Sequence, residues 1–102
     1  MMATDVTVVR IYCSEQDGRY RELLARLHEQ EKVAGVTAFR GIAGFGGSGR
    51  VHEAHLLDVS LDLPIVIEFF DRPEHVARIL ADLQEFIQPG HVISWPAKVN
   101  LE

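Results

Sequence analysis

The sequence has a single cysteine, Cys13, and no apolar run as long as a membrane span. One cysteine excludes an internal disulfide and is compatible with a reducing compartment. A membrane-spanning helix needs about 20 consecutive apolar residues, and no signal-peptide pattern opens the chain. We therefore expect a cytoplasmic protein that does not insert into a membrane.

Basic residues are also scarce. Ten Lys and Arg stand against fifteen Asp and Glu, which gives a formal net charge of −5. Such a chain repels polyanions as a whole, and this argues against a general nucleic-acid coat protein. The remaining composition is that of a globular protein, with 47% hydrophobic residues in a chain of 102, and predicts one domain. Leu101 and Glu102 are typical of a cloning scar before a tag, so we expect the domain to span residues 1–100.

The pattern of apolar residues predicts four strands and two helices. In chain order we expect a strand over 7–12, a helix from Arg19 that ends at Gly35, a strand over 36–42, a strand over 64–70, a helix capped by Asp71 whose apolar stripe reaches Ile87, and a strand over 92–99. This order predicts an α+β ferredoxin-like βαββαβ sandwich, in which two helices cover one face of a four-stranded antiparallel sheet. Right-handed crossovers place the first and third strands in the centre and the last at an edge, where Pro96 is tolerated.

Both faces of this predicted sheet carry apolar residues. An antiparallel sheet with one face in water normally alternates apolar and polar residues, and two helices cover only one face. The alternation is absent here, since one face receives Val9, Ile11, Ile65, Ile67 and Phe69 and the other receives Val8, Val66 and Phe70. We therefore expect the second face to pack against another copy of the chain in a closed homo-oligomer.

Two charged residues, Arg10 and Glu68, lie in the middle of the two strands expected at the centre of the sheet. A charge buried in an interface needs a partner of opposite charge. We predict that they pair on the face that meets other subunits, and we favour a structural role for the pair over a catalytic one.

A glycine-rich segment stands between the second and third predicted strands. Five of the nine residues from Gly41 to Gly49 are glycine, and the stretch from Lys32 to His52 has no acidic residue. Glycines let backbone N–H groups turn toward an anion, and the local charge of +3 favours a nucleotide phosphate or a carboxylate. The alternative is a loop whose glycines serve only flexibility. The candidate ligand-binding residues are Arg40, Gly41, Gly44, Phe45, Gly46, Gly47 and Arg50.

The same region holds two histidines, His52 and His55. Together with a carboxylate they have the ligand types of a divalent-metal site, although exposed loop histidines are the simpler interpretation. Nothing in the sequence predicts an enzyme, because no nucleophile elbow or Ser-His-Asp arrangement is present. Cys13 has no basic helix end beside it, so we expect an inert thiol.

The run RGIAGFGGSGRVHEAHLLDVSLDLPIVIEFFD resembles the signature of a small bacterial family of uncharacterised proteins in the PII-like superfamily. The segment VVRIYCSEQD and the first helix also fit, so the resemblance spans nearly the whole chain. The matching signature positions are Gly41, Gly44, Phe45, Gly46, Arg50, His52, Ser60, Asp62, Pro64 and Glu68.

This resemblance implies a ferredoxin-like homotrimer whose sheets line the inside and whose clefts between subunits bind small molecules, such as an adenine nucleotide or another small anion. Residues 43–63 would correspond to the T-loop, which contacts a partner such as a membrane transporter, a channel or a metabolic enzyme. The expected role is signalling, with no certain cofactor. A divalent-metal-binding trimer that resembles the cation-tolerance proteins, with His52 and His55 as ligands, is the alternative.

Two departures from the superfamily stand in the sequence. Signalling PII proteins hold phosphates with a loop rich in glycine and lysine after the second helix, whereas this chain has Gln88-Pro89-Gly90-His91 there. The T-loop tyrosine that some PII proteins have modified is also missing. If a nucleotide binds, Arg40, Arg50 and the glycine segment would carry more of the phosphate contacts.

Overall fold

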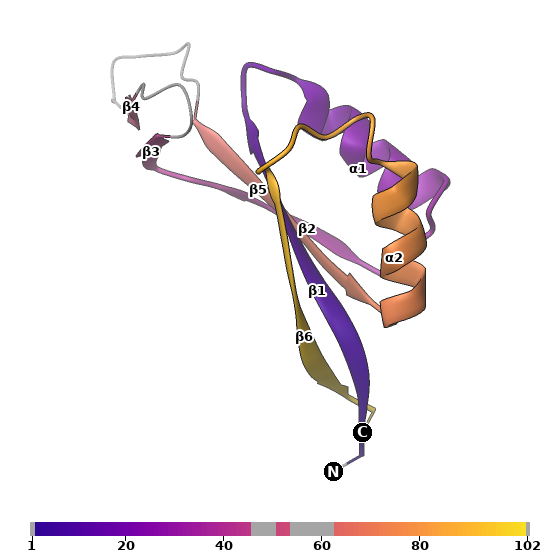
Figure 1. The fold of residues 1–102 in the computed structure, drawn as a ribbon. Coiled ribbons are helices and arrows are strands. Elements are labelled where there is room, and N and C mark those ends of the chain that lie inside the picture. The colour runs from indigo at the N-terminus through magenta and orange to yellow at the C-terminus, as the bar shows by residue number, and fades with distance from the viewer. Residues whose placement is uncertain (1, 46–50, 54–62, 102) are drawn as a thin grey trace.

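The computed structural model describes residues 2–45, 51–53 and 63–101. Its elements are β1 (Ala3–Ser14), α1 (Arg19–Glu29), β2 (Val36–Arg40), β3 (Ala43–Phe45), β4 (Val51–Glu53), β5 (Pro64–Asp71), α2 (Pro73–Asp82) and β6 (Val92–Asn100). Four of the strands form one antiparallel sheet in the order β2-β5-β1-β6, and both helices cover the same face of it (Figure 1). The predicted ferredoxin-like fold is confirmed, with β1 and β5 in the centre and β6 at an edge.

The helix-covered face of the sheet contains the core. The β1 and β5 residues that point to this side are buried, and they pack against buried residues of α1 and of the segment from α2 onward. Phe69 and Ile67 are the largest of the buried strand residues, together with Ile11. The core consists of Val9, Ile11, Leu23, Leu27, Val33, Ile65, Ile67, Phe69, Val76, Ile79 and Leu83.

Both helices end earlier than the sequence pattern predicted. The first ends at Glu29, with Gln30 as its C-cap, and Lys32 rather than Gly35 adopts the left-handed conformation, at φ 55°. The second ends at Asp82. Beyond it the chain tightens, because the Phe86 N–H donates to the Leu83 carbonyl oxygen, three residues back. The apolar stripe still continues through these turns, since Phe86 and Ile87 pack on the core.

The start of α2 also differs from the prediction. Asp71 is the last residue of β5, and Arg72 is the N-cap of the helix. The Asp71 carboxylate accepts a hydrogen bond from the Arg72 backbone N–H at 2.7 Å and lies 2.9 Å from Nδ1 of His75. The carboxylate is therefore engaged at the strand–helix junction without capping the helix as its N-cap residue.

A two-stranded hairpin, β3–β4, lies beyond the end of the main sheet, beside the start of β5 (Figure 1). The sequence pattern did not predict it, because each strand has only three residues. The chain termini lie at the opposite end of the molecule (Figure 1). In the part of the chain that the structure describes, neither helix has the length and apolarity that crossing a membrane requires.

Candidate functional site

The face of the sheet that the helices leave uncovered carries large apolar side chains. Cross-strand pairs place Val8, Phe70 and Trp95 in one row, and Tyr12, Val66 and Phe39 in another. We call this surface the open face. Several of its side chains are more than a third exposed, among them Phe39 (48%), Phe70 (47%), Ile93 (47%), Tyr12 (39%) and Trp95 (37%).

The centre of the open face holds the predicted ion pair. Arg10 and Glu68 are direct cross-strand partners, and Arg10 Nε donates to Glu68 Oε1 at 2.7 Å. This hydrogen bond raises the pKa of the Arg10 guanidinium above its usual range. The guanidinium also lies over the Trp95 ring, 5.6 Å from its centroid, which is a cation–π geometry. In the isolated chain the two side chains are 42% and 29% exposed.

Large exposed apolar patches on a protein of this size mark an interaction surface. Rows of apolar side chains on either side of one hydrogen-bonded ion pair suit packing against another protein surface, because the two charges already neutralise each other before they are buried. The predicted pairing of Arg10 and Glu68 is confirmed, whereas their structural role stays a prediction.

The second candidate region is the junction between β2, β3 and β5. Gly41 donates its N–H to the Pro64 carbonyl oxygen at 2.7 Å. A Cβ atom at Gly41 would lie 2.8 Å from Pro64 Cγ, and one at Gly44 would lie 3.0 Å from the same atom. A side chain at Gly41 would therefore clash with Pro64, and one at Gly44 would fit only if the Pro64 ring shifted. This packing explains them without a ligand, so a role of Gly41 and Gly44 in binding stays a prediction.

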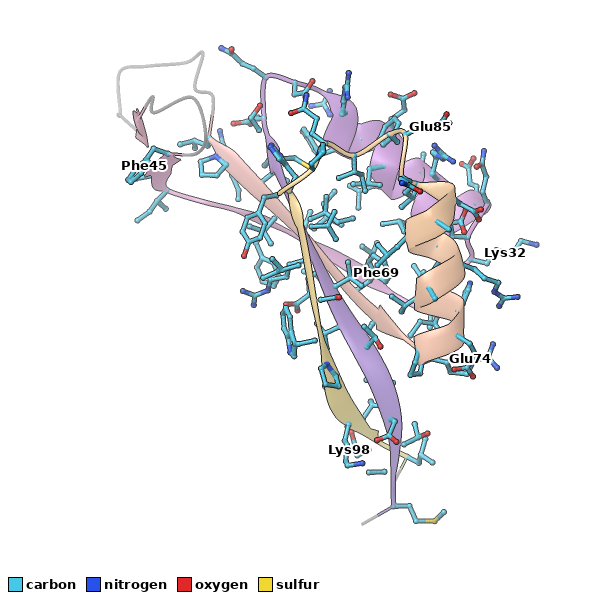
Figure 2. All side chains as sticks on the ribbon, in the orientation of Figure 1. Lys32, Phe45, Phe69, Glu74, Glu85 and Lys98 are labelled. Carbon is cyan, nitrogen blue, oxygen red and sulfur yellow. The ribbon has the colours of Figure 1, made fainter. Side chains whose placement is uncertain are left out.

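Arg40, which precedes this junction, has a partner that the sequence pattern did not reveal. Its Nε and Nη2 donate to Oε2 of Glu15 at 3.2 and 3.0 Å. The stretch from Lys32 to His52 lacks acidic residues, but Glu15 supplies one from the turn after β1. The positive charge of Lys32 is not near this junction, because Lys32 lies beside the helices, across the molecule from Phe45 (Figure 2). Lys32 and Arg40 are therefore not brought together, and Arg50, the third positive charge of this stretch, lies outside the described residues.

The other predicted site residues are placed as follows. Phe45 ends β3 with 74% of its surface exposed, and β4 pairs His52 with Gly44 along the backbone. Gly46, Gly47, Arg50 and His55 lie outside the described residues. The described residues contain no group of three His, Cys, Asp or Glu side chains arranged to hold a metal. The metal site at His52 and His55 stays a prediction.

Cys13 lies on the helix-covered side, opposite Ile65 in the sheet, and packs against the core. Burial raises the pKa of its thiol, and the negative charge of Asp17 adds to the effect. Both disfavour the reactive thiolate, which agrees with the expectation of an inert thiol.

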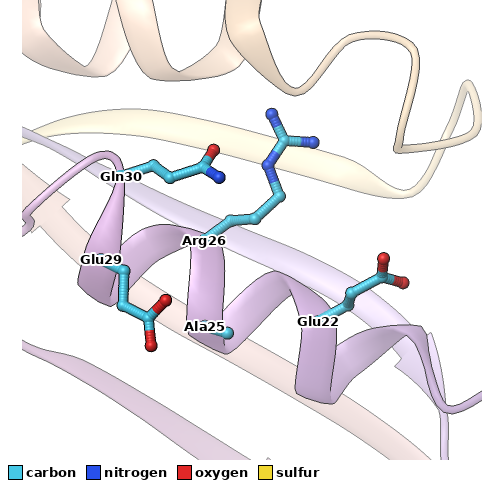
Figure 3. Close-up of a pocket in the computed structure, with 5 residues that line it drawn as sticks. All are labelled: Glu22, Ala25, Arg26, Glu29 and Gln30. Carbon is cyan, nitrogen blue, oxygen red and sulfur yellow. The ribbon is translucent and has the colours of Figure 1, made fainter.

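A depression of about 420 Å³ lies on the outer side of α1 (Figure 3). It is lined by Glu22, Ala25, Arg26, Glu29 and Gln30. Arg26 reaches toward the end of α2, where its guanidinium lies over the Phe86 ring at 5.5 Å. Its Nε is buried and has no hydrogen-bond partner among the described residues. Two carboxylates line this depression, so it does not suit an anion, and it is separate from both candidate regions.

Comparison with known proteins gives consistent matches. The model of the family DUF190, described as "Uncharacterized ACR", matches residues 6–99. A UPF0166 protein of Methanocaldococcus jannaschii is 32% identical over 90 residues, which cover 84% of this chain and 82% of the relative. A UPF0166 protein of Aquifex aeolicus is 33% identical over 82 residues, or 76% of this chain and 77% of the relative.

Solved structures show the same fold at lower identity. The structure of CPII from Thiomonas intermedia, bound to ADP and bicarbonate, superposes with a TM-score of 0.66 at 22% identity and covers 96% of this chain and 89% of that one. A putative PII-like signaling protein of Thermus thermophilus also gives 0.66 at 22% identity, over 97% of this chain and 91% of that one. The fold is therefore PII-like.

Proposed function

Because the chain belongs to the uncharacterised family DUF190 (UPF0166) and has a PII-like fold, we propose that it is a trimeric, non-enzymatic signalling protein. It binds a small anion, such as an adenine nucleotide or bicarbonate, between subunits. The 43–63 connection between β2 and β5 then contacts a partner protein. Binding biases the arrangement of the subunits and their connections, and the partner responds to that shift.

The observation that carries this proposal is the open face. Phe39, Phe70 and Trp95 remain partly exposed in a single chain, so one copy leaves an apolar layer in water. Self-association covers this layer and creates clefts between copies. In the full assembly the Arg10–Glu68 pair becomes desolvated, and its hydrogen bond and the Trp95 contact satisfy it there.

The choice of ligand is supported by the solved structures and by Arg40. CPII structures of this fold hold ADP with bicarbonate, or ADP, AMP and bicarbonate. Arg40 has a side chain that is 55% exposed, at the start of the 43–63 connection. A guanidinium in this position is suited to the two oxygens of a phosphate or a bicarbonate.

Native mass spectrometry of the freshly purified protein tests assembly and ligand together. We expect a trimer that retains ADP, AMP or ATP, or that gains mass when ADP and bicarbonate are added. A panel of anions in a thermal-shift assay complements it, because a ligand that binds only the folded state raises Tm. A monomer at micromolar concentration would contradict the assembly, and no response to any nucleotide or anion would contradict the ligand class.

A further inference from the structure

Glu15 contacts Arg40, the last residue of β2, and Leu63, the last residue of the 43–63 connection. Its backbone N–H donates to the carbonyl oxygen of Leu63 at 2.9 Å, and its carboxylate accepts the two hydrogen bonds from Arg40. Leu63 is 3% exposed, so the backbone contact is anchored in the interior. One residue in the turn after β1 thus joins the chain before the connection to the end of the connection.

The Arg40–Glu15 contact does not have the geometry of a two-oxygen pairing between a guanidinium and a carboxylate. Both donors, Nε and Nη2, converge on a single oxygen, Oε2, at 3.2 and 3.0 Å. The same edge of a guanidinium can donate two parallel hydrogen bonds to two oxygens of a carboxylate, phosphate or bicarbonate. A free oxyanion therefore offers Arg40 a better-matched partner than Glu15 does in this arrangement.

The contact is also accessible to a competitor. The Arg40 and Glu15 side chains are 55% and 28% exposed, and ion pairs in contact with solvent stabilise proteins only slightly. The backbone junction next to it does not depend on this pair, because the Gly41 N–H donates to the Pro64 carbonyl oxygen. Arg40 can therefore change partners while the β2–β5 junction stays in place.

We propose that Glu15 is an internal competitor for the oxyanion that Arg40 binds. This inference rests on the proposed function and adds its regulation. When the ligand binds, an external anion replaces the Glu15 carboxylate on Arg40, and the side-chain tie across the connection opens while the Glu15–Leu63 backbone tie remains. The carboxylate lowers ligand affinity both by occupying the guanidinium and by repelling a second negative charge.

The test is isothermal titration of ADP and of sodium bicarbonate, in separate arms, into the wild-type protein, Glu15→Gln and Asp5→Asn. Both variants raise the net charge by one, but Asp5 pairs with Lys98 at the end of the molecule far from Phe45 (Figure 2). We expect Glu15→Gln to bind about two- to fivefold more tightly, the range of an exposed ion pair. Asp5→Asn should match the wild type, because salt screens charges beyond about 10 Å. The arm that shows the gain identifies the oxyanion.

A double-mutant cycle separates competition from a general effect. Arg40→Ala should weaken binding by about tenfold or more. In that background most of the gain from Glu15→Gln should disappear, because only the direct repulsion between the Glu15 carboxylate and the anion is left to remove. Glu15→Ala serves as a second variant and should shift affinity in the same direction. If the wild type binds the anion and both Glu15 variants bind it with the same affinity as the wild type, the inference is wrong and the proposed function stands. If no variant and no wild-type chain binds either anion, both are wrong.

Discussion

The two faces of the sheet both carry apolar side chains, but the helices cover only one of them. Along β5, alternate residues point to opposite sides, and Ile65, Ile67 and Phe69 are at most 5% exposed under the helices. Phe70, on the open face, is an aromatic residue like Phe69, yet 47% of its surface is exposed. The comparison shows that the helices bury one face of the sheet, while aromatic side chains on the other face stay partly exposed in a single chain.

The largest expected effect concerns the covered face. Replacing Ile67 with Ala removes a side chain that is fully buried between the sheet and the helices, and should lower the free energy of unfolding by about 2–5 kcal/mol. Urea denaturation followed by circular dichroism measures this loss. The neighbouring Val66→Ala, on the open face, is the control and should cost less when the protein is dilute. Equal losses for the two variants would break the distinction between the faces.

An intermediate effect is expected on the open face. Phe70→Ala removes an aromatic side chain from the open face, which we propose to be the interface and where such residues often contribute about 2 kcal/mol or more to association. A loss of this size lowers an association constant about 30-fold for each contact, so dissociation of the oligomer should begin at a higher protein concentration. Light scattering behind a size-exclusion column, over a dilution series, measures it.

The control for this variant is Phe45→Ala. Phe45 is also exposed but lies in β3, outside the four-stranded sheet. Its removal should leave the oligomer unchanged. An oligomer that responds equally to both substitutions, or to neither, would place the interface elsewhere.

The smallest expected effect concerns the reactivity of Cys13, which lies at the border of the covered face and packs against the core. Its pKa is raised, mainly by burial and further by Asp17. A raised pKa leaves less thiolate at any pH below it, so iodoacetamide should modify Cys13 more slowly than it modifies glutathione at pH 8. The rate should continue to increase at pH values where that of glutathione has levelled off. A rate equal to that of glutathione would show that Cys13 lies outside the covered region.

The fold was predictable because the strands and helices follow from local sequence patterns, and the strand order follows from the right-handedness of crossover connections. The run after Pro64 is β-branched and aromatic, and β5 begins at Pro64. The strand order follows from the handedness of crossovers, and Pro96 is consistent with the edge strand. The helix ends were predicted less well, because apolar periodicity reports which residues pack on the core and continues through the turns after Asp82.

The candidate site was only partly predictable. Arg10 and Glu68 were recognised as a pair because both stand in the middle of central strands, so their register brings them together. Glu15 was missed, since it is 25 residues before Arg40 in the sequence and lies in a turn without a motif. The sequence shows that no acidic residue stands between Lys32 and His52. The charge around Arg40 also depends on residues distant in the sequence, such as Glu15, that the fold places next to it.

The position of the two ends has a practical consequence. Leu101 donates its backbone N–H to the Met2 carbonyl oxygen at 2.9 Å, so both ends leave the molecule together, away from β3 and β4 (Figure 1). A linker attached at either end therefore anchors the protein on a bead or sensor chip with the hairpin directed toward the solution. Immobilised in this way, the protein leaves the β3–β4 hairpin accessible, and a tag at either end does not obstruct it (Figure 1), which suits a capture experiment for the partner that we propose.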